Sequence, residues 1–93
     1  MTEPTLKLVV AWSDRRNLCS LVRDALTTFA PEVDVLPLGD DATVVYTAQS
    51  ADALRDALRG RLEHGDNLLV SVFEVWSSHG AESDATWLLA RGH

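Results

Sequence analysis

The 93-residue sequence predicts a single α+β domain whose elements follow the order strand, helix, strand, strand, helix, strand. Two segments carry apolar residues at helical spacing, and four short segments rich in β-branched and apolar residues flank them. The length suits one domain spanning 1–93, with frayed ends expected at 1–5 and 91–93.

The first strand and the first helix lie at the start of the chain. Residues 6–12 form an apolar run with little polar interruption, as in a central strand that is covered on both faces. Helical spacing of apolar side chains then predicts a helix over 15–30. Ser13 or Asp14 is expected to cap it, because a short side-chain oxygen can accept a hydrogen bond from the first turn.

The middle of the chain predicts a pair of antiparallel strands. Residues 33–38 form the first of them, and Pro37 indicates that it lies at an edge of the sheet. A polar turn over 39–41 has hairpin length, and the β-branched segment 43–48 returns as the next strand.

The second helix and the last long strand follow. A helix is predicted over 50–64, with Ser50 as its N-terminal cap and Gly65 in the left-handed position after it. The strand predicted over 68–76 is apolar on both faces, so both faces are expected to be covered.

This order is the ferredoxin-like pattern, a four-stranded antiparallel sheet with both helices on one face. We expect the segment 86–90 to form a short C-terminal strand. The other sheet face then stays open, and its apolar patch favours a symmetric homodimer. The predicted interface residues are Phe73, Val75, Trp76, Trp87 and Leu89.

Composition narrows the possible functions. The net charge of −6 disfavours nucleic-acid binding, which depends on Lys and Arg contacts with phosphates. No apolar run approaches the roughly 20 residues of a membrane span, and the first residues do not resemble a signal peptide. Cys19 is the only cysteine, so it forms no internal disulfide and is best explained as a half-buried apolar residue. We expect a cytoplasmic protein with no membrane contact, no cofactor and no metal.

Several short motifs stand out in the region 43–87. They are Ser50-Ala51-Asp52, Leu54-Arg55-Asp56, Leu58-Arg59 and Asp66-Asn67-Leu68-Leu69-Val70. With these motifs the region resembles the SinR-like family, small relatives of CRISPR-associated protein 2. The resemblance implies a ferredoxin-like homodimer whose C-terminal strand pairs with the partner's sheet. Some of these bacterial proteins are scaffolds that hold DNA in antiviral defence, and others, including VapD-type toxins, are metal-dependent ribonucleases.

The chain departs from this family at the position that matters for catalysis. In the nuclease relatives a carboxylate follows the aromatic residue that ends the first strand, whereas here Ser13 follows Trp12. A hydroxyl is a poorer ligand than a carboxylate for a hard divalent cation. We therefore expect a non-catalytic binding or scaffold module. One alternative is a Mg²⁺-dependent endoribonuclease that uses Asp14, and another is an adaptor that recruits a protein through its acidic surface.

Other polar residues have a simple and a functional interpretation. Arg15 and Arg16 are either solvated charges or contacts to the phosphates of nucleic acid or to a partner's carboxylates. The arginines of the second helix are either a solvated face or a phosphate-binding stripe. The tryptophans are either packing residues or stacking platforms for bases. A polar loop near the C-terminus is either plain surface or a metal site. The helix arginines are Arg55, Arg59 and Arg61, the tryptophans are Trp12, Trp76 and Trp87, and the loop residues are His79, Glu82 and Asp84.

Overall fold

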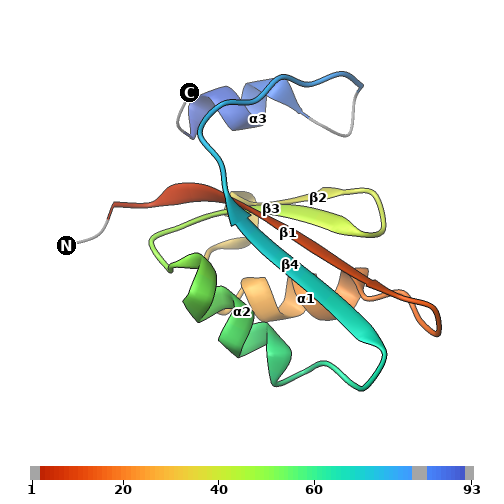
Figure 1. Cartoon of the computed structure of the whole chain (residues 1–93). Coiled ribbons are helices and arrows are strands. Elements are labelled where there is room, and N and C mark those ends of the chain that lie inside the picture. The colour runs from red at the N-terminus through yellow and green to blue at the C-terminus, as the bar shows by residue number, and fades with distance from the viewer. Residues whose placement is uncertain (1–2, 81–83, 92–93) are drawn as a thin grey trace.

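The computed structural model describes residues 3–80 and 84–91 and confirms the α+β class, with one four-stranded antiparallel sheet (Figure 1). The strand order is β2-β3-β1-β4, so β1 is internal and β2 and β4 are the two edges. The elements are β1 (Thr5–Ser13), α1 (Cys19–Leu26), the short 3₁₀ helix η1 (Glu32–Asp34), β2 (Val35–Leu38), β3 (Ala42–Thr47), α2 (Ala51–Arg59), β4 (Asp66–Val72) and α3 (Ala85–Ala90).

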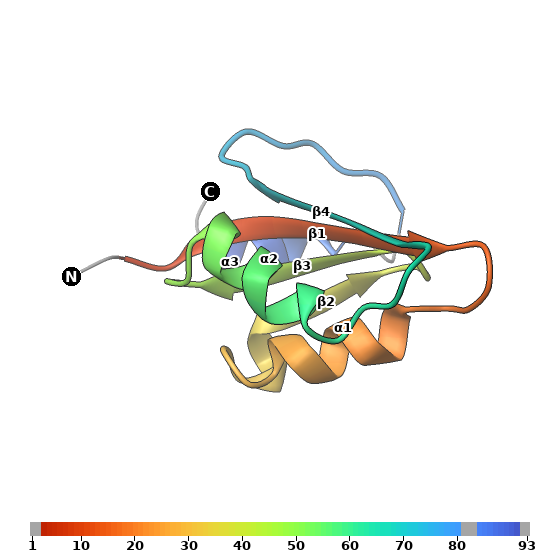
Figure 2. The same ribbon diagram turned by 60° about the horizontal axis from the view of Figure 1, so that its bottom comes forward.

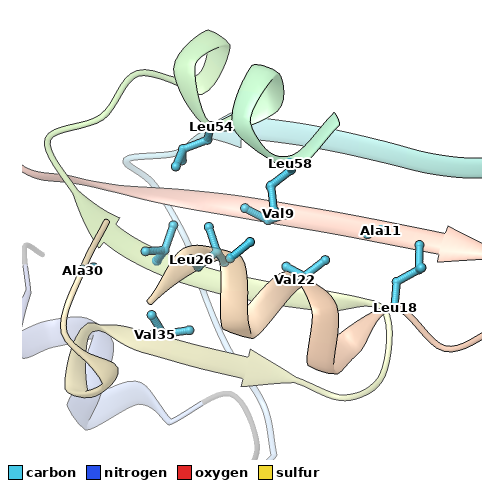
Figure 3. Packing of buried hydrophobic residues seen from close by; sticks show 11 residues of the cluster. Val9, Ala11, Leu18, Val22, Leu26, Ala30, Val35, Leu54 and Leu58 are labelled. Atoms are coloured by element: carbon cyan, nitrogen blue, oxygen red, sulfur yellow. The ribbon is translucent and has the colours of Figure 1, made fainter. Parts of the chain in front are cut away.

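The main core lies between the sheet and helices α1 and α2, which cover the same face (Figures 1 and 2). Side chains alternate along β1, so Val9 and Ala11 point into this core while Leu6 belongs to a second cluster on the opposite face. Leu54 and Leu58 are fully buried and bring α2 onto the sheet (Figure 3). Both predicted helices therefore lie on one face, as expected.

Helix α1 is shorter than the predicted helix over 15–30, and the predicted cap is wrong. Residues after β1 form a bend, and the helix begins only at Cys19, whose N–H donates to Asn17 Oδ1 at 2.8 Å. Ser13 Oγ instead accepts from the Arg15 N–H at 3.2 Å within the bend. Bonds from this bend to a distant loop, described below, hold it out of the helix.

Helix α2 begins as predicted and ends early. Ser50 Oγ accepts from the Ala53 N–H at 3.1 Å, which confirms the predicted cap. The helix stops at Arg59 rather than His64, so the prediction of a helix to 64 is wrong. Gly65 does have a positive φ of 94°, but it lies in the turn that enters β4 and not directly after the helix.

The C-terminal segment differs most from the prediction. Strand β4 ends at Val72 instead of residue 76, and the chain bends at Glu74. The segment expected to be a strand is helix α3, and Asp84 Oδ1 accepts from the Trp87 N–H at 3.1 Å at its start. The helix lies on the sheet face that was predicted to be open (Figure 1), with Leu88 buried there. That face is therefore partly covered by the chain itself.

Two residues are held at places where frayed ends were expected. Thr5 pairs with Thr47 between β1 and β3, and Arg91 bonds to Asp34. Thr5 and Arg91 themselves are therefore not frayed.

Candidate interaction surface

Arg15 and Arg16, the predicted nucleic-acid contacts, join two loops that are far apart in sequence. A guanidinium nitrogen of Arg15 donates to the carbonyl of His64, and Arg16 Nη2 lies 2.5 Å from Asp66 Oδ2. These bonds fix the bend after β1 against the turn that enters β4. Because each guanidinium is used inside the chain, the bend acts as a structural clamp.

Asp66 is the acidic half of this clamp. Its side chain is only 1% exposed, and Oδ2 also accepts from the Glu63 N–H at 2.9 Å. The hydrogen bond from Arg16, together with that N–H, holds the pKa of Asp66 well below its usual range, while Asp66 raises the pKa of Arg16. The carboxylate stays ionised and paired at neutral pH, so it is a structural group and not a proton acceptor.

Asp14, the candidate catalytic residue, stands at the surface of the same bend. Asp14 is exposed, and no hydrogen bond or ion pair joins its side chain to another described residue. It is therefore not the helix cap that we predicted as its simplest role. Within residues 3–80 and 84–91, no three His, Cys, Asp or Glu side chains gather as a group able to hold a metal ion.

The polar loop considered as a metal site is only partly described. Glu82 lies outside the described residues, and Asp84 serves as the cap of α3. The donor set at the end of β1 fits a divalent cation poorly, since Asp14 is a single exposed carboxylate and the Ser13 hydroxyl already accepts a hydrogen bond.

Helix α3 is fixed to η1, the short 3₁₀ helix that precedes β2. Trp87 Nε1 donates to the Val33 carbonyl at 2.7 Å, and Arg91 Nε lies 2.8 Å from Asp34 Oδ1. The Arg91 guanidinium also stacks over the Trp87 ring at 4.2 Å from its centroid. Two of the predicted interface residues, Phe73 and Trp76, pack with Trp87 against this second cluster, so these three side chains are engaged within the chain.

Apolar side chains that the chain leaves uncovered gather at β4 and its neighbour. Leu69 is 57% exposed, Val72 is 50% exposed, and Trp12 on the adjacent strand is 42% exposed. Leu69 is opposite Val10 in the β1–β4 register, which places it on the same sheet face as Trp12. Val72 is opposite Lys7 and therefore lies on the other face, which carries α1 and α2. We call Trp12, Leu69 and Val72, which flank the β4 edge on its two faces, the exposed β4 surface. The sequence predicted an apolar patch on this strand and left open which of its two alternating sets of side chains is exposed.

The other predicted interface residues remain at the surface elsewhere. Val75 is 94% exposed and Leu89 is 59% exposed. Val75 also lines an apolar hollow of about 470 Å³ between the sheet and the segment that leads to α3. The walls of this hollow include Leu8, Val44 and Trp76.

Lys7 is a buried charge that sequence reasoning missed. It is 3% exposed, and Nζ donates to the Thr47 carbonyl at 2.6 Å. Burial lowers its pKa. Its position inside an apolar strand was visible in the sequence, but its depth depends on the helices that cover it.

In the described part of the chain, no helix has the length and hydropathy needed to cross a membrane. Comparison of the sequence and structure with protein-family models, curated proteins and solved structures found no match. The likeness to the SinR-like family therefore stays a prediction, and the function has to be argued from the surface described above.

Proposed function

We propose that this protein is a small, non-catalytic binding module that works as a homodimer. The observation that carries this proposal is the exposed β4 surface, where Trp12, Leu69 and Val72 leave large apolar side chains in water. A domain of this size buries a modest share of its surface, so association that covers such side chains adds stability. A setting in bacterial defence or nucleic-acid handling rests on the family resemblance alone.

The chemistry of the residues at the end of β1 supports the non-catalytic part. The Ser13 hydroxyl stabilises the bend, and the nearest strand carboxylate, Asp66, is neutralised by Arg16. Asp14 offers one exposed carboxylate, whereas Mg²⁺ usually takes carboxylates together with other oxygen ligands. An endoribonuclease that uses Asp14 is the alternative that an assay decides.

The assay incubates purified protein with labelled RNA in the presence of Mg²⁺ or Mn²⁺. We expect no cleavage by the wild-type protein. Cleavage that disappears in Asp14→Ala but persists in Asp24→Ala, an exposed carboxylate on α1, would establish the nuclease and overturn the non-catalytic proposal.

Sedimentation velocity tests the homodimer. We expect a mass near twice 10.2 kDa at micromolar concentration. A mass that stays near 10.2 kDa up to about 1 mM would contradict the dimer. In that case, co-purification of a different protein would favour the adaptor alternative.

A further inference from the structure

The backbone of β4 presents unpaired hydrogen-bonding groups to the outside of the sheet. The Phe73 N–H donates to the Leu6 carbonyl at 3.3 Å, and Leu6 lies on β1. In an antiparallel pair, alternate residues bond to the neighbouring strand, so Leu69 and Ser71 face β1 like Phe73. Residues 68, 70 and 72 consequently direct their N–H and C=O groups outward, away from β1.

These outward groups have few partners within residues 3–80 and 84–91. The Val72 carbonyl accepts a long bond of 3.4 Å from its neighbour's hydroxyl, Ser71 Oγ. The outward N–H of Asp66, at the start of the strand, is used by the Glu63 carbonyl at 3.0 Å. The outward N–H groups of Leu68, Val70 and Val72 form no hydrogen bond with another described residue.

The side chains along this edge do not oppose pairing. From Leu68 to Val72 the strand carries no charge and no proline, which are two devices that proteins use to protect a sheet edge. Val72 is half exposed on the face that carries α1 and α2, and Leu69 is more than half exposed on the other face. The edge is therefore a template for another strand.

We propose that β4 pairs with β4 of a second copy, in antiparallel orientation, about a two-fold axis at Val70. The proposal rests on the homodimer proposed above and names its interface. In this register Val70 lies opposite its own copy and Leu68 lies opposite the partner's Val72. All three outward N–H groups then find outward carbonyls, which gives about six hydrogen bonds across the axis. The two sheets become one continuous sheet.

The same register brings two of the exposed side chains, Val72 and Leu69, beside residues of the partner. Leu68 and the partner's Val72 become cross-strand neighbours on the face of α1 and α2. Leu69 lies opposite the partner's Ser71 on the other face. Residues 68–72 carry no charge, so the two-fold axis brings no like charges together between the paired strands.

Helix α2 supports the choice of a second copy. A shallow groove of about 300 Å³ separates α2 from β4, and Arg55, Arg59 and Leu68 are among its lining residues. Along this part of the helix the charges alternate as Asp52, Arg55, Asp56 and Arg59. When α2 of a second copy runs in the opposite direction, its acidic residues lie opposite the basic residues of α2 in the first copy. These residues also pair within their own helix, Arg55 with Asp52 and Asp56, and Arg59 with Asp56. An antiparallel α2 of the partner presents the same charges in the complementary order, so the two helices do not repel each other although the whole chain carries −6.

The test removes an outward hydrogen-bond donor of β4 and leaves the hydrogen bonds between β4 and β1 unchanged. Val72→Pro deletes an outward N–H, and proline is tolerated at such positions of an edge strand. We expect the dissociation constant of the dimer to rise at least about tenfold, since two hydrogen bonds are lost per dimer. Val72→Lys, which keeps the N–H but places a charge beside the partner's Leu68, should weaken the dimer by a similar factor.

Val75→Lys is the matched control, because it adds the same charge at an apolar residue that is 94% exposed and lies beyond the end of β4. Circular dichroism confirms that each variant is folded. We expect Val75→Lys to dimerise like the wild type in sedimentation. A wild-type dimer that both folded Val72 variants leave unchanged would overturn the β4 interface and keep the homodimer, whereas a monomeric wild type would overturn both.

Discussion

The two edges of the sheet are built in opposite ways. On the β2 edge the outward residues are Val35 and Pro37, because Leu36 and Leu38 face β3 in the register. The Val35 N–H donates to the Glu32 carbonyl, and Pro37 has no N–H to offer. At these two positions the β2 edge therefore has no free N–H, because Val35 already donates its N–H and Pro37 has none.

The β4 edge keeps its outward donors. It is the longer strand, with seven residues against four, and the N–H groups of Leu68, Val70 and Val72 point outward as free donors among the described residues. Proteins normally protect such edges, so the contrast indicates that the unprotected one serves association. The β2 edge is closed within the chain, and our proposal is that a partner completes the β4 edge.

The largest effect on the β2 side should come from releasing α3. Leu88→Ala removes a side chain that is 5% exposed and packs against the sheet beside Val44. We expect the free energy of unfolding to fall by about 2–4 kcal/mol in urea denaturation. Leu89→Ala on the same helix, where the side chain is 59% exposed, should change it by less than about 0.5 kcal/mol. Equal losses in both variants would show that α3 is not held by Leu88.

A smaller, pH-dependent effect is expected at the start of β4. The pKa of Asp66 is depressed in the folded protein, so its stabilising contribution is present above the unfolded pKa of about 3.9 and is lost as pH falls toward the folded pKa. Asp66→Asn should lower the free energy of unfolding at pH 7 and flatten its fall between about pH 5 and pH 3. Thermal melts over this range check it, and an unchanged acid slope would contradict the Arg16–Asp66 clamp.

The smallest effect on stability, but an informative one, is expected from unprotecting the β2 edge. Pro37→Val adds an outward N–H and should change the free energy of unfolding by less than about 1 kcal/mol. With two open edges, the variant should form assemblies larger than the dimer in sedimentation. Pro4→Val, outside the strands, is the control. If Pro37→Val assembles like the wild type, proline at this edge has no protective role.

The sequence allowed prediction of features that depend on neighbouring residues. The central position of β1, the β2–β3 hairpin and the Ser50 cap each follow from a local pattern, and the structure confirms them. The late start of α1 was not predictable in this way, because Arg16 is held by Asp66, a residue 50 positions away.

The candidate surface was predicted only in part, again because contacts between distant residues decide which side chains are covered. Trp87 was expected at an interface with a second chain, but its indole N–H reaches the Val33 carbonyl of its own chain. With α3 on that face, the large apolar side chains that stay exposed on β1 and β4 there are Trp12 and Leu69. What is left uncovered depends on contacts between distant segments, which no local pattern contains.

The most direct test of the central claim is amide hydrogen exchange along β4, measured by NMR at several protein concentrations. The N–H groups of Leu69 and Ser71 bond to β1 and should be protected at every concentration. We expect the N–H groups of Leu68, Val70 and Val72 to exchange quickly in dilute protein and to become protected as the dimer forms. Fast exchange at these three amides in a sample shown to be dimeric would contradict it.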